Sequence, residues 1–362
     1  MKRVVIVGGG YAGTSLARSL DAVAEVVLVE PRDRFVHNVA AIRALVEPGL
    51  LDEIVIPYDR LLKRGQVVHD RAIAIEGASV KLAGGGSIEG DIIVVATGSR
   101  YARPFKPEAE SVPSFVAASR ANHQALVAAK TVAVIGAGAV GTELAGEIAA
   151  AFPAKKVTLI SAHPTLFHAY PPRLGRKLEA QLKAMRVTLR MGAPARPPKS
   201  NDTPFAGRVE MSAGDPITAD LVFPVMGARP VNDVLRALPG VTLDSLGRAV
   251  VDAWLRPTDA PNLFALGDVA AAGDLMTIVA ISRQQPWLTK TIKALIEGKA
   301  LESLPAYKPW SSPPILIPLG EAAGASVLPF TNKGVVVGSF LTASIKGRQL
   351  FVPRYLKEFG YA

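Results

Sequence analysis

The chain has 362 residues, of which 49% are hydrophobic and 20% are charged, as expected of a folded protein with two or three domains. It contains no cysteine, which excludes disulfides, thiolate metal sites and a redox-active dithiol. The formal net charge is +10, and a basic surface attracts anionic partners such as nucleotides, acidic proteins, anionic lipids or nucleic acid.

The N-terminal segment resembles a signal peptide only superficially. Met1, Lys2 and Arg3 precede an apolar run that is too short for such a peptide, and Lys2 does not fit an N-myristoylation motif. No apolar run reaches the length of about 18 residues that a transmembrane helix requires. We therefore expect a cytoplasmic protein without a metal site, in which any membrane contact is peripheral.

The first 30 residues have the pattern of a βαβ unit. An apolar strand at 4–7 runs into a Gly-x-Gly-x-x-Gly loop, a helix follows at 11–20, and a second strand ends at Glu30. The loop glycines are Gly8, Gly10 and Gly13. Such a loop lets the backbone approach a pyrophosphate at the helix N-terminus, and an acid about 20 residues later binds ribose hydroxyls. The segment therefore predicts a dinucleotide site.

Extended segments follow the first unit. Residues 67–80 are predicted to be extended, and within them Ala72 is a small residue at which the backbone can reach an adenine. Residues 91–98 have the pattern of a buried parallel strand that ends in Thr97 and Gly98. This strand is expected to belong to the first nucleotide-binding sheet.

A second glycine loop lies near the middle of the chain. An apolar strand at 132–135 precedes it, and a helix at 139–150 follows it. Its glycines are Gly136, Gly138 and Gly141. Two loops in the same strand–glycine–helix context are much more specific than one, and they predict two dinucleotides.

The strand at 220–227 repeats the pattern of residues 91–98, since each has aspartate first and glycine seven positions later. In the repeat this glycine is Gly227. The repeat favours two homologous nucleotide-binding domains in tandem. Pro224 is unfavourable inside a sheet, so we expect its strand at an edge or locally bulged.

A third apolar strand, at 262–266, ends in Gly267 and Asp268 and indicates a return to the first domain. We therefore expect an α/β fold with two Rossmann-like domains, the second inserted in the first, and a small α+β C-terminal domain. The expected ranges are 1–105 with 235–304 for the first domain, 106–234 for the inserted domain, and 305–362 for the C-terminal domain.

The C-terminal segment predicts a hairpin, with strands at 327–330 and 335–340, and a short helix at 354–361. Its basic residues are Lys346, Arg348, Arg354 and Lys357, which together with apolar neighbours are suited to resting on an anionic membrane. The alternative is a domain that simply closes the nucleotide site.

Positive charge is concentrated between Lys155 and Lys199, where Glu179 is the only acid. This stretch is either a solvated surface or a docking face for an anionic partner. It lacks the interleaved aromatic residues of single-strand binders, so nucleic acid is not expected as a partner.

These motifs together resemble the two-dinucleotide-binding flavoprotein superfamily, which includes glutathione reductase-like enzymes, type II NADH dehydrogenases and apoptosis-inducing-factor-like reductases. The segments 35–44 and 350–355 are similar to the ferroptosis-suppressor branch of NAD(P)H:quinone oxidoreductases. The resemblance implies noncovalent FAD in the first domain, NADH or NADPH in the inserted domain, and a quinone as acceptor. Glutathione reductase-like dimers are not implied, because the tail is short, and a monomer or homodimer is expected.

The resemblance also implies roles for individual residues. Those expected to bind FAD are Gly8, Gly10, Gly13, Glu30, Arg43, Ala72, Thr97, Gly98, Gly267 and Asp268. Those expected to bind the nicotinamide nucleotide are Gly136, Gly138, Gly141 and Gly227. Glu143 matches a glutamate near the nicotinamide, and His37 is the candidate for stabilising reduced flavin or giving a proton to the quinone.

The chain departs from the superfamily at several positions. His37 and Asn38 stand where disulfide reductases carry their cysteine pair, so those enzymes and sulfide:quinone reductases are excluded. The paired glutamines of type II dehydrogenases are present, but the glutamine that precedes them in those enzymes is not. The candidate quinone contacts are therefore Gln284, Gln285 and Trp287. The strand at 157–161 ends in Ser161 rather than an acid, which leaves the choice between NADH and NADPH open.

Two other functions fit the sequence. A reductase of ferredoxin or rubredoxin would use the basic stretch to dock an acidic partner. A non-catalytic redox or nucleic-acid-binding sensor would use the same charge without turnover.

Overall fold

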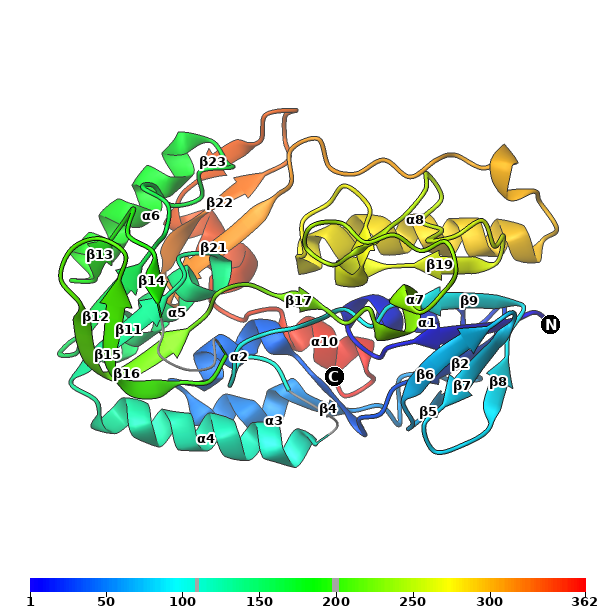
Figure 1. Cartoon of the computed structure of the whole chain (residues 1–362), viewed down its shortest axis with the longest axis horizontal. Coiled ribbons are helices and arrows are strands. Elements are labelled where there is room, and N and C mark those ends of the chain that lie inside the picture. Colours follow the sequence, from blue (N-terminus) through cyan, green and yellow to red (C-terminus); the bar gives the residue numbers. More distant parts are fainter. Residues whose placement is uncertain (108–110, 197–201) are drawn as a thin grey trace.

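The computed structural model describes residues 1–107, 111–196 and 202–362, so Lys199 of the basic stretch lies outside the described residues. The molecule contains a five-stranded parallel β-sheet and a six-stranded mixed β-sheet, each with covering helices, and a three-stranded C-terminal sheet (Figure 1).

The first sheet contains five parallel strands. In spatial order they are β19 (Leu263–Ala265), β9 (Ile92–Val95), β1 (Arg3–Val7), β2 (Glu25–Val29) and β5 (Gln66–Val68). The inner strands are buried on both faces, which explains their continuous valine and isoleucine runs. On one face α1 (Tyr11–Leu20) packs against α8 (Ile278–Ile296), and the strands expected at 4–7, 91–98 and 262–266 all lie in this sheet.

Smaller elements surround the first sheet. Two antiparallel groups lie beside it, β3 (Arg34–Val36) with β4 (Val55–Pro57), and β6 (Ala72–Glu76) with β7 (Ser79–Leu82) and β8 (Ser87–Glu89). The remaining ones are α2 (Asn38–Ala44), η1 (Pro48–Leu50), α3 (Leu51–Ile54), β18 (Ala249–Val250), η2 (Gly267–Val269), β20 (Ala270–Ala271) and η3 (Leu301–Ser303).

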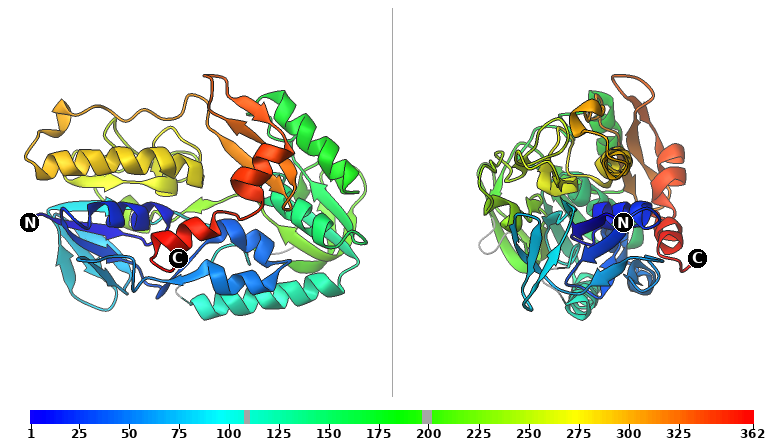
Figure 2. Two further views of the ribbon diagram at one scale, coloured as in Figure 1. Left: turned by 180° about the vertical axis from the view of Figure 1, so that it is seen from behind. Right: turned by 90° about the vertical axis from the view of Figure 1, so that its right-hand side faces the viewer.

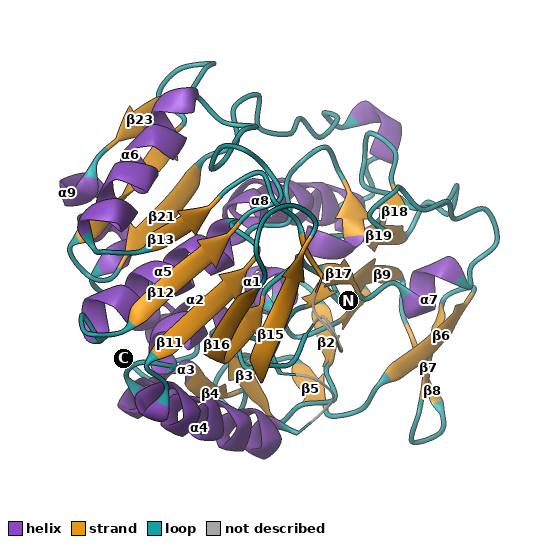
Figure 3. Cartoon of the chain, turned by 60° about the vertical axis from the view of Figure 1, so that its left-hand side comes forward, coloured by secondary structure: helices purple, strands orange, loops and turns teal. Residues whose placement is uncertain are grey.

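The second sheet has six strands. In order they are β13 (Thr188–Arg190), β12 (Lys156–Ile160), β11 (Thr131–Ile135), β16 (Ile217–Pro224), β15 (Phe205–Met211) and β14 (Ala195–Arg196). Figure 3 shows these strands side by side with α4 (Val112–Ala128), α5 (Ala139–Ala151) and α6 (Pro172–Ala184) around them. Of the two alternatives for the strand of Pro224, the edge position is wrong, because β16 lies between β11 and β15, whereas the local bulge is present as a register shift between β15 and β16 next to Val222. Pro224 is tolerated there as the last residue of its strand.

The chain crosses between the two sheets through β10 (Ser99–Arg100) and β17 (Arg229–Pro230), which pair antiparallel. Just after the first crossing, Phe105 packs against Phe223 of the second sheet, with ring centroids 6.0 Å apart. After the second, Val234 of α7 (Asp233–Arg236) packs among the core residues of the first sheet. Both crossings therefore lie a few residues before the boundaries expected at 105/106 and 234/235.

The C-terminal module packs on the inserted domain. Its sheet is formed by β21 (Ile315–Leu319), β22 (Ala323–Leu328) and β23 (Val335–Val337), so the expected hairpin is present. The sheet lies on α5 and α6 (Figure 1), and a Cβ on Gly146 of α5 would lie only 2.7 Å from the Cα of Leu319. The chain ends with α9 (Ser339–Thr342), a π-turn (Ala343–Gly347) and α10 (Val352–Glu358), which replaces the helix expected at 354–361.

Candidate functional site

One cavity of about 990 Å³ follows the carboxyl ends of the strands of the first sheet and continues to the crossing strands β10 and β17. Its volume is at the upper end of the range for small-molecule sites, and its position is the usual one for ligands of open parallel sheets. The residues expected from sequence that line it are Gly8, Gly10, Glu30, Ala72, Thr97, Gly98, Gly227, Gly267 and Asp268.

The first glycine loop forms one wall of the cavity. Gly8 has φ +107°, and a Cβ there would lie 2.6 Å from the carbonyl oxygen of Ala96. Gly13 lies beneath the loop, where a Cβ would lie 1.9 Å from the carbonyl oxygen of Gly8. Gly10 is different, because no protein atom lies within 4 Å of its Cβ position. Gly8 and Gly13 are therefore required for the turn itself, and Gly10 leaves space for a ligand.

The second loop has the same geometry. Gly136 has φ +107°, and its Cβ would lie 2.4 Å from the carbonyl oxygen of Val225. The Cβ of Gly141 would lie 1.8 Å from the carbonyl oxygen of Gly136, whereas Gly138 again has open space. These three glycines do not line the 990 Å³ cavity, whereas Gly227, which is expected at the same nucleotide, does.

Glu30 is buried at the end of β2, next to the first loop. Its Oε2 accepts a 2.7 Å hydrogen bond from the backbone nitrogen of Gly9, and its Oε1 accepts one of 2.5 Å from Nε of Arg32. The carboxylate is thus fixed beside the glycine turn, where ribose hydroxyls of a bound dinucleotide would lie. Arg32 also lines the cavity, and sequence reasoning missed it although it stands only two residues after the acid.

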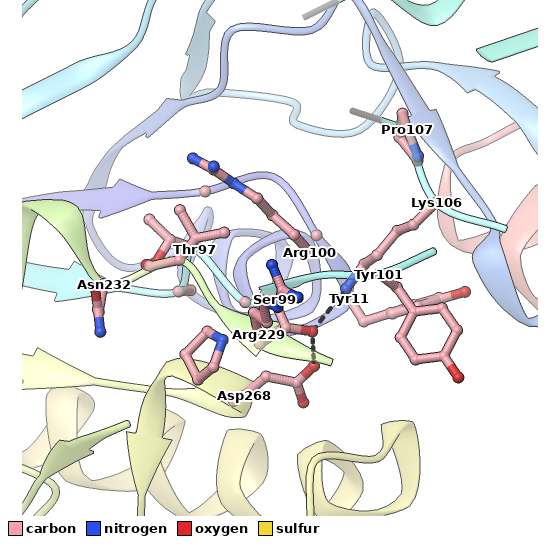
Figure 4. A pocket seen from close by; sticks show the side chains of 18 of the residues that line it. Tyr11, Thr97, Ser99, Arg100, Tyr101, Lys106, Pro107, Arg229, Asn232 and Asp268 are labelled. Carbon is pink, nitrogen blue, oxygen red and sulfur yellow. Dashed lines mark hydrogen bonds between the residues drawn. The ribbon is translucent and has the colours of Figure 1, made fainter. Parts of the chain in front are cut away.

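A chain of hydrogen bonds crosses the cavity floor near the tip of β9 (Figure 4). Nζ of Lys106 donates to Oγ of Ser99 over 3.0 Å, and that hydroxyl donates to Oδ2 of Asp268 over 2.6 Å. Burial lowers the pKa of Lys106, and the nearby Asp268 opposes this effect. Lys106 and Ser99 were not predicted, and their only sequence signal is that they follow Thr97 and Gly98.

His37 does not lie in the cavity, so the role expected for it needs correction. Its Nε2 donates to the carbonyl oxygen of Leu350 over 2.6 Å, and its Nδ1 accepts from the hydroxyl of Tyr11 over 3.0 Å. Burial lowers its pKa to about 4. The ring is therefore neutral, with both nitrogens engaged, and Tyr11 is the residue of this pair that lines the cavity.

Glu143 is buried on α5, where it pairs with Lys346 of the C-terminal module. Nζ of Lys346 lies 2.7 and 2.9 Å from the two carboxylate oxygens. Burial raises the pKa of Glu143 to about 7, although the lysine opposes this shift. Glu143 does not line the cavity, but its charge acts on Tyr101, which does. Lys346 was expected on a membrane surface, and this pairing shows that expectation to be wrong.

Arg43 is also placed differently from the expectation. Its guanidinium is buried and binds the carboxylate of Glu147, with Nη2 2.8 Å from Oε1. Glu147 lies one helical turn after Glu143 on α5, so this ion pair joins α2 to the inserted domain. Arg43 supports the interface between domains and does not line the cavity.

The three candidate quinone residues on α8 serve packing instead. Gln284 accepts a 2.9 Å hydrogen bond from the backbone nitrogen of Gly267 and donates to Asp274, so it supports the cavity from behind. Gln285 donates to Ser15 and Ser19 of α1, and Trp287 donates to the carbonyl oxygen of Pro305. None of the three lines the cavity, and Ile281 is the residue of α8 that does. The apolar segment Ile315–Leu319 packs on α5 as β21.

Comparison with known proteins agrees with this geometry. The sequence profile of the pyridine nucleotide-disulphide oxidoreductases matches residues 2–291, a range that includes both glycine loops and the return strand. The chain belongs to this family.

Two relatives illustrate the likeness over nearly the whole length. Apoptosis-inducing factor homolog B of Dictyostelium discoideum is 30% identical, covering 99% of this chain and 96% of the relative. Human ferroptosis suppressor protein 1 is 28% identical, covering 96% and 93%. Among solved structures, the sulfide:quinone oxidoreductase of Aquifex aeolicus has a TM-score of 0.78 at 15% identity, over 99% of this chain and 91% of that one. At that identity the likeness shows the fold alone.

Proteins of the pyridine nucleotide-disulphide oxidoreductase family use FAD and NAD(P)H, and this chain is a FAD-dependent NAD(P)H oxidoreductase. The cavity fits the flavin nucleotide, because its glycine turn, the Glu30 carboxylate and the cationic Lys106 match pyrophosphate and ribose chemistry. This family member has no cysteine, so its electrons do not leave through a protein dithiol.

Proposed function

We propose that this protein is an NAD(P)H:quinone oxidoreductase that works at a membrane surface. The observation that carries the proposal is a set of exposed apolar side chains on the C-terminal module, namely Phe330, Phe340, Leu341 and Ile345. A flavoprotein without cysteine must meet its acceptor directly, and an apolar surface brings it to the lipid phase in which quinones dissolve.

The C-terminal apolar surface has the composition of a peripheral membrane contact. Phe330 and Phe340 are 72% and 75% exposed, and Leu341 and Ile345 are 42% and 39% exposed. Phe330 lies in the loop of the β22–β23 hairpin, which projects from the module (Figure 2), and Phe340 lies on α9. Nζ of Lys177 lies beside Gly338, one residue before α9, and supplies positive charge that complements anionic headgroups. None of the helices within the described ranges is long and apolar enough to cross a bilayer.

Each loop has a distinct task in this proposal. FAD, when bound, accepts hydride from NAD(P)H and passes the electrons to the acceptor. Gly8 allows the tight turn and Gly10 leaves room for its pyrophosphate, Glu30 binds its ribose, and the Lys106–Ser99–Asp268 chain holds charge and hydrogen-bond donors at the cavity floor. The nicotinamide nucleotide binds at the second loop, through Gly136, Gly138, Gly141 and Gly227.

The proton balance gives Glu143 a role. Oxidation of NAD(P)H by a quinone consumes one proton from the protein or solvent and yields NAD(P)⁺ and the quinol. Burial raises the pKa of Glu143 to about 7, so its carboxyl can hold such a proton near neutral pH, although it does not line the cavity. The pairing of Glu143 with Lys346 places this group where the C-terminal module meets the inserted domain.

The proposal is tested by steady-state turnover of the purified yellow protein with a short-chain soluble quinone, with a long-chain quinone in anionic vesicles, and with a ferredoxin. We expect turnover with both quinones. The double variant Phe330→Ser/Phe340→Ser is expected to retain activity with the soluble quinone and to lose vesicle binding and long-chain quinone reduction. Turnover with ferredoxin but with neither quinone would contradict the proposal.

A second candidate function, reduction of a small acidic electron-transfer protein, is favoured by the exposed Arg173 and Arg176 on α6. Basic surfaces steer acidic partners and raise their association rate at low salt. If this function is correct, ferredoxin turnover falls steeply with ionic strength and Arg173→Glu/Arg176→Glu abolishes it, while quinones give no turnover.

A further inference from the structure

The two glycine-loop units of this chain correspond residue by residue. In the first unit Val7 lies opposite Val29, and the nitrogen of Gly8 donates to the carbonyl oxygen of Val29 over 2.8 Å. In the second unit Ile135 lies opposite Ile160, and the nitrogen of Gly136 donates to the carbonyl oxygen of Ile160 over 2.9 Å. The next residue after each second strand is Glu30 in the first unit and Ser161 in the second.

This correspondence makes Ser161 the position that reads the adenosine ribose of the second nucleotide. Glu30 presents a carboxylate, which accepts from ribose hydroxyls and repels a phosphate. Ser161 presents a hydroxyl that accepts from the backbone nitrogen of His163 over 3.1 Å, and its own hydrogen has no acceptor within the described ranges. The backbone of Ser161 is held by Arg190 and Ala193, so the hydroxyl has a fixed place. A hydroxyl donates readily to a phosphate oxygen.

Nitrogen-bearing side chains lie next to this position along the chain. The imidazole rings of His163 and His168 lie in the loop after Ser161, exposed, with centroids 4.0 Å apart. Arg190 lies opposite Ile160 at the end of β13 and forms no ion pair with any described residue.

Acidic groups are almost absent from the same region. Glu179 is the only acid between Lys155 and Arg196, and it pairs with Lys183 on α6 over 2.8 Å. Nothing along this part of the chain offers the carboxylate that an unphosphorylated ribose would use, whereas His163, His168 and Arg190 offer N–H donors to a phosphate.

We propose that Ser161, His163, His168 and Arg190 form a site for the 2′-phosphate of NADPH, so that NADPH is the preferred electron donor. The inference rests on the proposed function only in taking the second loop as the nicotinamide nucleotide site, and it is independent of the acceptor. It assigns the excess positive charge at this end of the second sheet to nucleotide choice.

The binding test compares adenosine 2′,5′-bisphosphate with AMP by calorimetry on the FAD-loaded protein. We expect the bisphosphate to bind at least about tenfold more tightly, which is the size expected for a few charge-assisted hydrogen bonds. Ser161→Glu, which copies Glu30, should remove this preference and leave AMP binding unchanged. Lys183→Ala, on the same basic stretch but paired with Glu179, is the matched control and should change neither value.

The kinetic test follows flavin reduction by NADPH and by NADH under anaerobic conditions without any acceptor. The wild type should prefer NADPH by about tenfold or more in the second-order rate constant, and Ser161→Glu should reverse the order. Equal binding of the bisphosphate and AMP, or reduction as fast with NADH as with NADPH, overturns the inference. The acceptor proposal fails separately, when NADPH reduces the flavin but no quinone reoxidises it.

Discussion

The open space at Gly10 and Gly138 gives a reciprocal prediction about the two loops. Gly10 has φ −77° and Gly138 has φ −73°, values that any L-residue can adopt, and no protein atom lies within 4 Å of either Cβ position. Gly10→Ala and Gly138→Ala therefore add a methyl group that meets no protein atom. A nucleotide pyrophosphate that approaches the loop closely would meet it.

The size of each effect follows from this geometry. Without strain or a clash, the ligand-free protein should change in stability by no more than about 1 kcal/mol, mainly from the poorer capping by alanine. Forcing a methyl group into a close contact costs about 1–3 kcal/mol, which is about a 5- to 140-fold rise in Kd. Gly10→Ala should weaken FAD alone, and Gly138→Ala should weaken the nicotinamide nucleotide alone.

The assay measures FAD affinity by reconstitution of stripped protein and nucleotide affinity by the concentration dependence of flavin reduction. Thermal melting of the stripped protein checks that the fold is intact. Gly49→Ala, another glycine with open space but away from the cavity, is the control. Wild-type FAD affinity in Gly10→Ala, or loss of FAD in Gly138→Ala, would refute the assignment of the loops.

Three further predictions concern buried charges. Arg43→Met leaves the Glu147 carboxylate buried without its partner and should lower the free energy of unfolding by about 3–5 kcal/mol. The double variant Arg43→Met/Glu147→Met should recover most of this lost stability. Equal melting temperatures of the single and the double variant would contradict the prediction. Burial lowers the pKa of His37 in the folded state from the usual 6.5 to about 4. The neutral ring therefore stabilises the fold fully above pH 6.5, and this stabilisation is lost as the pH falls through about 4. His37→Asn should therefore flatten the melting temperature between pH 4 and 6.5, and an unchanged slope would disprove the assignment. The pKa of Glu143 is raised from 4.5 to about 7, so wild-type stability should fall as the pH rises through about 7, and Glu143→Gln should abolish that fall in a pH series of melts.

Local patterns predicted the parts of the site that lie within one βαβ unit. The spacing of Gly8, Gly10 and Gly13 and the place of Glu30 depend on a single turn and the length of one helix, so the sequence carries them directly. The return strand at 262–266 was also predictable, because a buried parallel strand has a continuous apolar run.

The long-range pairs could not be predicted in this way. Ser99 and Asp268 are 169 residues apart, and Glu143 and Lys346 are 203 residues apart, and they meet only because separate modules pack together. Lys346 carried the pattern of a surface lysine, since nothing near it in the sequence reports a buried carboxylate. The paired glutamines on α8 misled for a related reason. The packing of α8 against α1 sets their orientation, so the side-chain amide of Gln285 donates to the hydroxyl of Ser19 and does not line the cavity.

The central claim is that electrons pass from a nicotinamide nucleotide through FAD to a quinone. Double-mixing stopped flow tests it most directly: the protein is first reduced with one equivalent of NADPH without oxygen, and then mixed with a soluble quinone while the flavin absorbance is followed. The account predicts bleaching in the first step and full recovery of the yellow band in the second, at a rate that is at least the steady-state turnover. Bleaching without recovery, or recovery only with a ferredoxin, would contradict it.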